Sequence, residues 1–280
     1  MFYESLYNGD QIPVLGQGTW GLGGGMVADY SRDDHARNAI RAAIELGYTH
    51  IDTAEMYGAG HTEELVGQVI RDYPRQELFI SSKVWHITMN YQDTLKALEG
   101  SLRRLATPYL DLYLIHRPNH DIPLEETFRA LNELVEQGRV RHLGVSNFNL
   151  GQLKRAQSLS ATPLVTNQVP YNLHNRAYQK NGVLEYCQAN GILLTAYSPI
   201  DRGHLLTDAT ILRIAQEIDA TPPQIALQWL LRQPLVIALP MSSRVDHLQE
   251  NLGALHLALS DEKVDELNQI ELSEEVLWPE

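Results

Sequence analysis

The stretch SRDDHARNAIRAAIELGYTHIDTA at residues 31–54 contains one complete helix-to-strand transition. Apolar residues recur at helical spacing from Ala36 to Ile44, and Gly47 can adopt the left-handed conformation that often ends a helix. The first four residues, SRDD, match the pattern of a capping box, which predicts that the helix starts at Ser31. The last five, HIDTA, predict a short strand. The stretch is therefore one amphipathic helix followed by one strand.

The same alternation of strand and helix extends along almost the whole chain. Such alternation predicts a parallel sheet, and eight units predict closure into a (β/α)8 TIM barrel of the α/β class. An open doubly wound sheet has the same periodicity and remains the alternative. The expected strands are at residues 14–18, 50–54, 78–84, 109–116, 140–147, 164–169, 192–199 and 236–240.

Three segments lie outside this regular ladder. Residues up to about Gln11 are expected to form a β-hairpin that closes the bottom of the barrel. Two helical stretches, at 210–218 and 222–231, precede the last strand, and a final C-terminal helix is expected at 261–270. Because nothing resembles a linker, residues 1–280 are predicted to form a single domain.

The composition narrows the class of partner. A net charge of −13 argues against nucleic acid and anionic membranes, since phosphate contacts need Lys or Arg. Cys187 is the only cysteine, the start lacks the features of a signal peptide, and no apolar run is long enough to cross a membrane. We therefore expect a cytoplasmic protein that acts on small molecules as a monomer or weak homo-oligomer.

Residues 16–21, GQGTWG, match the dinucleotide fingerprint G-x-G-x-x-G. That motif works only where a helix starts, so that the helix N-terminus can hold a pyrophosphate. The residues that follow, LGGG, form a poor helix. We interpret the match as a loop at the barrel mouth, where Trp20 is a candidate wall of a substrate pocket.

Three ionisable residues follow neighbouring strands at equivalent positions: Asp52, Lys83 and His116. For each residue alone, a structural ion pair or packing is the alternative to a catalytic role. Because barrel enzymes place their chemistry where strands end, the recurrence predicts that all three converge at one rim.

Tyr57 lies in the loop that leaves the strand of Asp52. A lysine ammonium beside this phenol is expected to lower its pKa from about 10, and Asp52 would keep Lys83 charged and in place. Tyr57 then becomes a general acid for a carbonyl oxygen that receives hydride on its carbon, and His116 orients that oxygen. This catalytic set needs no metal.

These residues lie in segments that resemble the aldo-keto reductase family, in particular bacterial-type aldehyde and methylglyoxal reductases. Each segment alone is weak, but their order and spacing across nearly the whole chain are specific. The resemblance implies the barrel fold and a catalytic tetrad at Asp52, Tyr57, Lys83 and His116, with Tyr57 as the acid. The matching segments are 18–20 (GTW), 52–58 (DTAEMYG), 82–83 (SK), 114–116 (LIH), 144–148 (GVSNF), 167–168 (NQ) and 196–199 (AYSP).

The resemblance also implies a nicotinamide cofactor, NADPH, with NADH as the alternative. It places the carboxamide against strand-end polar groups, the ring on Tyr197 and the adenine near Glu250 and Asn251. Ordinary strand-end hydrogen bonding or aromatic packing is the alternative for each residue alone. The candidate cofactor-binding residues are Gly18, Thr19, Trp20, Asp52, Ser146, Asn147, Gln168, Tyr197, Ser198, Pro199, Ser242, Arg244, Glu250 and Asn251.

The chain departs from its relatives at the expected site for the 2′-phosphate. NADPH-preferring relatives carry Lys at the position of Met241 and Arg at that of His247. Arg244 lies between them and is a candidate phosphate ligand together with Ser242; a solvated surface arginine is the alternative. We expect NADPH use with a reduced margin over NADH.

The candidate substrate-binding residues are Trp20, Tyr57, Trp85 and His116. The loop at 116–123 and the tail that ends at residues 276–280 are short, which predicts an open pocket for small aldehydes and 2-oxoaldehydes such as methylglyoxal. Arg117 stands where many relatives have Trp, so the pocket edge is expected to favour an anionic or polar group.

Two other functions remain open at this point. A nicotinamide-binding sensor or regulatory subunit would share the fold and the cofactor cleft but turn over slowly. A metal-dependent hydrolase could use His116 and Asp52; against it, the strand ends carry no His-x-His pair, and Lys83 would repel a metal.

Overall fold

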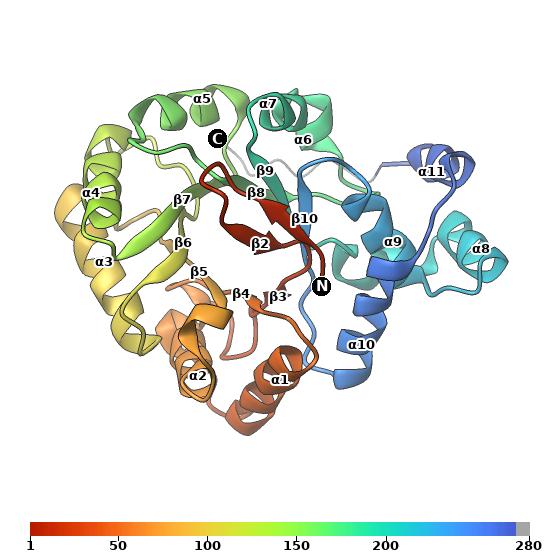
Figure 1. The fold of residues 1–280 in the computed structure, drawn as a ribbon, viewed down its shortest axis with the longest axis horizontal. Helices are drawn as coiled ribbons and strands as arrows, with labels where there is room; N and C mark the ends of the chain where they lie inside the picture. The colour runs from red at the N-terminus through yellow and green to blue at the C-terminus, as the bar shows by residue number, and fades with distance from the viewer. Residues whose placement is uncertain (273–280) are drawn as a thin grey trace.

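Eight parallel strands form the centre of the fold in a computed structural model, which describes residues 1–272 (Figure 1). The amide of Gly16 donates to the carbonyl of Ala238 at 3.0 Å, so the last strand returns to the first and closes the barrel. The predicted (β/α)8 barrel is confirmed, and the open sheet is wrong. The strands pair in chain order as β3 (Gln17–Gly18), β4 (His50–Asp52), β5 (Phe79–Val84), β6 (Leu110–Ile115), β7 (Val140–Ser146), β8 (Thr166–Pro170), β9 (Leu193–Tyr197) and β10 (Val236–Leu239).

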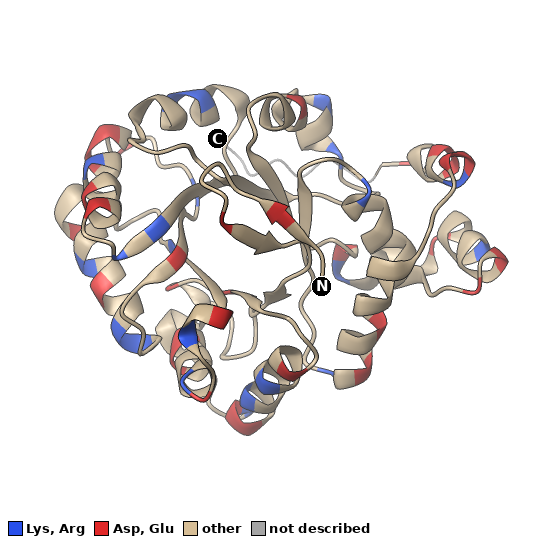
Figure 2. Ribbon diagram, viewed as in Figure 1, with Lys and Arg blue, Asp and Glu red and all other residues tan. Residues whose placement is uncertain are grey.

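Helices surround the barrel and carry most of the charged residues visible in Figure 2. The extra helix predicted before the last strand and the helix after the barrel are confirmed as α8 and α11. The α-helices are α1 (Asp33–Glu45), α2 (His61–Ile70), α3 (Tyr91–Arg104), α4 (Leu124–Glu136), α5 (Leu150–Leu159), α6 (Ala177–Lys180), α7 (Val183–Ala189), α8 (Ala209–Glu217), α9 (Pro222–Leu231), α10 (Val245–Gly253) and α11 (Asp261–Asn268). Short 3-10 turns lie at η1 (Tyr57–Gly60), η2 (Arg75–Glu77), η3 (Asp201–Thr207) and η4 (Ala254–His256).

The start of α1 differs from the prediction. Arg32 occupies the N-cap position and no side chain caps the helix. The amide of Ser31 instead donates to Asp29 Oδ1 at 2.9 Å, which makes Ser31 part of the preceding turn. The expected stop is confirmed, because Gly47 has a φ of 99°. The match GQGTWG contains β3 (Gln17–Gly18), and the expected loop leaves that strand; no helix begins in residues 1–32, so the fingerprint has no helix N-terminus.

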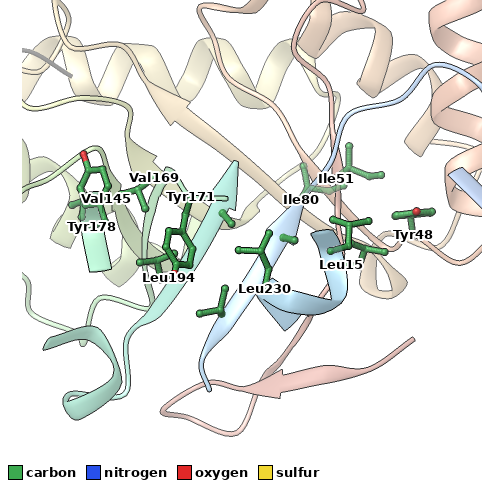
Figure 3. Close-up of a cluster of buried hydrophobic side chains, with 14 of the residues drawn as sticks. Leu15, Tyr48, Ile51, Ile80, Val145, Val169, Tyr171, Tyr178, Leu194 and Leu230 are labelled. Carbon is green, nitrogen blue, oxygen red and sulfur yellow. The ribbon is translucent and has the colours of Figure 1, made fainter. Parts of the chain in front are cut away.

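The core has two layers. The larger lies between the strands and the helices, and Figure 3 shows part of it, including Leu15, Ile51 and Leu194. The smaller fills the bottom of the barrel, where the predicted hairpin is confirmed as β1 (Tyr3–Ser5) and β2 (Gln11–Pro13). Ile12 of the hairpin is fully buried against apolar side chains of the strands. The hairpin crosses the barrel centre in Figure 1, so this end is closed by packing.

Two further observations concern Cys187 and the length of the helices. Cys187 is buried in α7, and burial raises the pKa of its thiol to about 12. Within residues 1–272, no helix has the length and apolar character needed to cross a membrane.

Gly67 is the contact point between α2 and the end of α3. A Cβ there would lie 2.4 Å from the carbonyl oxygen of Arg104 and 2.9 Å from Leu105 Cα. Because both atoms are backbone, we expect Gly67→Ala to lower the free energy of unfolding by about 1–3 kcal/mol. Urea unfolding measures this change. Gly151→Ala in α5 is the matched control, since its nearest neighbour is 3.5 Å away. A loss as large in the control would contradict the close contact.

Candidate active site

Lys83 is fully buried at the end of β5, and three oxygen atoms surround its ammonium group. Its Nζ donates to Asp52 Oδ2 at 2.6 Å, to the carbonyl of Thr53 at 2.8 Å and to the hydroxyl of Tyr57 at 3.4 Å. Burial is the largest influence and lowers the pKa of Lys83, but the attraction of Asp52 and Tyr57 outweighs it and raises the pKa overall. The lysine is therefore charged at neutral pH.

Asp52 is held by groups from two other strands, β5 and β8. Its Oδ2 accepts from Lys83 of β5, and its Oδ1 accepts from Ser81 Oγ at 2.8 Å and from Gln168 Nε2 of β8 at 3.0 Å. Ser81 was not among the residues predicted from the sequence. Its position two residues before Lys83 places both on one face of β5, and this period of two is the signal that could have found it.

Tyr57 lies at the start of η1, between two aromatic rings. Its ring centroid is 5.0 Å from that of Trp20 and 5.7 Å from that of His116, both in edge-on geometry. Burial raises the pKa of Tyr57, and the opposing effect of Lys83 is smaller, so the pKa lies above its ordinary value. The expected lowering of this pKa is wrong, because it neglected the cost of burying a phenolate. The phenol is protonated at neutral pH.

His116 is buried directly after β6. Burial lowers the pKa of its imidazole well below the ordinary range, and the positive charges of Lys83 and Arg117 lower it further. A neutral imidazole carries one N–H donor. The ring of Trp85 lies edge-on at 5.0 Å from His116. Neutral His116 and protonated Tyr57 therefore line the same space.

Glu55 fixes the loop that carries Trp85 and was not among the residues predicted from the sequence. Its Oε1 accepts from the amide of Trp85 at 2.5 Å and from Thr88 Oγ1 at 3.2 Å. Burial raises the pKa of the carboxyl. No sequence pattern marked this contact, because it joins two loops.

Polar groups at the ends of β7, β8 and β9 form a connected row. Ser146 Oγ donates to the carbonyl of Gln168 at 2.8 Å, and Asn147 Nδ2 donates to the carbonyl of His116 at 3.0 Å. The hydroxyl of Tyr197 donates to Asn147 Oδ1 at 2.9 Å. Since Gln168 also contacts Asp52, the row joins the catalytic candidates at one rim.

The remaining candidates at the barrel mouth directly follow β3 and β9. Both the amide and the hydroxyl of Thr19 donate to the carbonyl of Asp52, at 3.1 and 2.9 Å. Gly18 pairs with the chain after β10, and Trp20 is 41% exposed. Ser198 has a φ of 50°, and the buried Pro199 follows it.

A second group of candidates lies on α10 and the loop before it. Gln17 Nε2 of β3 donates to the carbonyl of Ser242 at 2.8 Å, which ties this loop to the barrel. Ser242 Oγ accepts from the amide of Arg244 at 3.1 Å. Asn251 is buried and Glu250 is half-buried.

Arg244 has a partner, Asp246, that was not predicted from the sequence. Its Nε donates to Asp246 Oδ1 at 3.0 Å, its second nitrogen pairs with Asp246 Oδ2, and both side chains are more than half exposed. The hydrogen bond from Arg244 lowers the pKa of Asp246 to about 2. The pair borders a cavity of about 310 Å³. This cavity is lined by His35, Asn38, Ala39, Ser243, Arg244, Val245 and Asp246.

The loop between β6 and α4 spans residues 116–123, which confirms its expected shortness. The short tail predicted at 276–280 lies outside the described residues. Within residues 1–272, no group of three or more His, Cys, Asp and Glu side chains could hold a metal ion.

A closed barrel with polar side chains gathered where β4, β5 and β6 end is the architecture of a barrel enzyme. The model of the aldo/keto reductase family matches residues 14–272. The chain belongs to the aldo/keto reductase family and is an oxidoreductase.

Named relatives and solved structures agree with this assignment. The chain is 36% identical to methylglyoxal reductase YeaE of Escherichia coli, over 94% of this chain and 93% of the relative. It is also 36% identical to the glyoxal reductase of Bacillus subtilis, over 97% and 93% of the two chains. The crystal structure of a thermostable aldo-keto reductase with the inhibitor epalrestat is similar, with a TM-score of 0.94 and 50% identity over 96% of this chain and 99% of that one. An aldo/keto reductase of Klebsiella pneumoniae, solved with NADP and acetate, has a TM-score of 0.87 and 34% identity over 97% and 96%.

Proposed function

We propose that this protein reduces small aldehydes and 2-oxoaldehydes such as methylglyoxal to alcohols, with NADPH as hydride donor and Tyr57 as proton donor. The observation that carries the proposal is the fully buried Lys83–Asp52 pair, whose ammonium reaches the hydroxyl of Tyr57 at 3.4 Å. The names of the methylglyoxal and glyoxal reductases, both 36% identical, support this choice of substrate.

The residues around the barrel mouth fit a nicotinamide. Ser146, Asn147 and Gln168 offer hydroxyl and amide groups that suit a carboxamide, and the half-buried ring of Tyr197 stands beside them. We assign the adenosine half to Ser242, Glu250 and Asn251. When bound, the cofactor supplies a hydride to the carbonyl carbon.

The proposed mechanism divides the remaining work among four side chains. Tyr57 and the neutral His116 each donate a hydrogen bond to the carbonyl oxygen, which fixes its position. As the carbon gains hydride, the developing alkoxide takes the proton of Tyr57. Lys83 stabilises the phenolate that remains, and Asp52 holds Lys83 in place. Trp20 and Trp85 form walls beside the reacting carbon.

The domain organisation, the location and the partners of the protein are also part of the proposal. The chain acts as a single domain on free small molecules in the cytoplasm, without nucleic acid or membrane, as a monomer or weak homo-oligomer. The net charge of −13 and the single cysteine support this setting.

The proposal is tested by mixing the purified protein with NADPH and methylglyoxal and following the loss of absorbance of the reduced nicotinamide. Turnover that depends on the aldehyde is the expected result. Tight NADPH binding without turnover on a panel of small aldehydes would contradict the reductase and favour the sensor.

The pKa directions at the site predict the pH profile of reduction. Tyr57 must be protonated, so activity is present below its pKa, which burial raises above its ordinary value of about 10. His116 must be neutral, so activity is present above its pKa, which burial lowers well below about 6.5. We expect kcat/KM to be flat from about pH 6.5 to 10. A fall centred between these values would contradict the assignment.

Asp246 is expected to limit the preference for NADPH. Its carboxylate already pairs with Arg244, the proposed 2′-phosphate ligand, and would repel that phosphate. Asp246→Asn should therefore raise the ratio of NADPH to NADH affinity several-fold, as measured by quenching of protein fluorescence. In the Arg244→Ala background the same substitution should produce a smaller gain. An equal gain in both backgrounds would show that Asp246 acts without Arg244.

A further inference from the structure

Arg117 places a positive charge at the edge of the proposed pocket. It lies in the loop between β6 and α4, directly after His116, and its side chain is half-buried. Its guanidinium carbon lies 5.3 Å from the centroid of the Trp85 ring. Because Trp85 also contacts His116 at 5.0 Å, the cation stands beside the proposed donors to the carbonyl oxygen.

The charge balance around the reacting carbonyl makes this cation significant. Lys83 and Asp52 cancel each other, and His116 is neutral. Burial and the charge of Arg117 also lower the pKa of His86, so that ring is neutral as well. Arg117 therefore brings a positive charge close to the Lys83–Asp52 pair and the neutral His116.

The position of Arg117 suits a ligand inside the pocket. Burial lowers its pKa, and interaction with Tyr197 and Tyr57 opposes this effect, so both phenols lie within electrostatic reach of the guanidinium. An arginine remains charged at neutral pH in spite of this lowering. Stacking on Trp85 restricts the motion of the planar group. A planar guanidinium carries a fork of N–H donors, which matches the two oxygen atoms of a carboxylate.

We propose that Arg117 binds a carboxylate of the substrate, so that short oxo acids are preferred over neutral aldehydes of the same length. The carbonyl oxygen lies at Tyr57 and His116, and the carboxylate a few atoms away pairs with the guanidinium through two parallel hydrogen bonds. Local attraction offsets the repulsion that a protein of net charge −13 exerts on anions. This inference rests on the proposed reductase function and specifies its substrate class.

The test compares 4-oxobutanoate with its uncharged methyl ester, methyl 4-oxobutanoate. We expect kcat/KM of the wild type to be about 10- to 100-fold higher for the acid, mainly through KM, since a charge-assisted pair has this effect. Arg117→Met retains a stem that can pack on Trp85 and should lose most of this ratio. Arg117→Lys should keep an intermediate ratio, because it keeps the charge without the fork. Arg71→Met, which removes an exposed charge at the end of α2, should keep the wild-type ratio.

The salt dependence of the wild-type preference provides an independent test. Its preference for the acid should fall as salt rises to about 0.5 M, because screening weakens a partly exposed ion pair. Equal turnover of the two substrates by the wild type would overturn the role of Arg117 while leaving the reductase intact. An unchanged ratio in a folded Arg117→Met variant would do the same. Turnover of no carbonyl at all would instead contradict the proposed function.

Discussion

Replacing Tyr57 with Phe is expected to lower kcat for aldehyde reduction by about 10²- to 10⁴-fold, the contribution typical of a positioned general acid. The substitution removes only the hydroxyl that lies 3.4 Å from Lys83 Nζ. The ring keeps its edge-on contacts with Trp20 and His116, so the pocket keeps its shape. Binding of NADPH should change little. Single-turnover kinetics with saturating NADPH measures the loss directly.

Tyr113→Phe provides the matched control. Tyr113 is fully buried in β6, and within the described part of the chain its hydroxyl has no hydrogen-bond partner. Removal of that hydroxyl should leave kcat within a few-fold of the wild type. If Tyr57→Phe retained comparable activity, the proton would have to come from another group, and the proposed mechanism would be wrong.

Lys83→Met is expected to affect both catalysis and stability. Without the ammonium, the phenolate of Tyr57 loses its stabilising charge, so kcat should fall by about 10²-fold or more. Asp52 would become a buried carboxylate without its cation, which costs about 3–5 kcal/mol when a buried pair is broken. Thermal unfolding and the reduction assay measure the two effects on the same sample.

The double variant Asp52→Asn/Lys83→Met separates these effects. With no charge left to bury, most of the lost stability should return, because neutral replacement of a buried pair is often harmless. The activity should not return, since the cation beside Tyr57 is still missing. Recovery of both together would mean that Lys83 acts only as a structural element.

The order of the strands and the convergence of Asp52, Lys83 and His116 were predictable from the sequence. Apolar periodicity is a local signal, and each helix and strand here contains its own. Parallel strands then carry their C-terminal ends to one rim, so residues about one strand–helix unit apart meet there. The position of each residue at the end of its strand was therefore enough to predict that the three side chains meet.

Other parts of the site depend on contacts that sequence spacing does not encode. Gln168 reaches Asp52 across the barrel, from a strand far away in the sequence. Burial raises the pKa of Tyr57 and the charge of Lys83 lowers it. Which effect is larger depends on how deeply the folded protein buries the phenol, and sequence spacing does not give this depth. The pairing of Arg244 with Asp246 was not predicted for a different reason. It depends on the side-chain rotamers of two exposed residues, which the sequence does not specify.

The origin of the groups that hold Asp52 has a consequence for engineering. Its partners Lys83, Ser81 and Gln168 all come from strands, whereas Trp85 and Arg117 belong to loops. Loops can be exchanged with little effect on a strand framework. A library randomised at Trp20, Trp85 and Arg117 should therefore yield catalysts with new substrate ranges that retain the same proton-delivery apparatus.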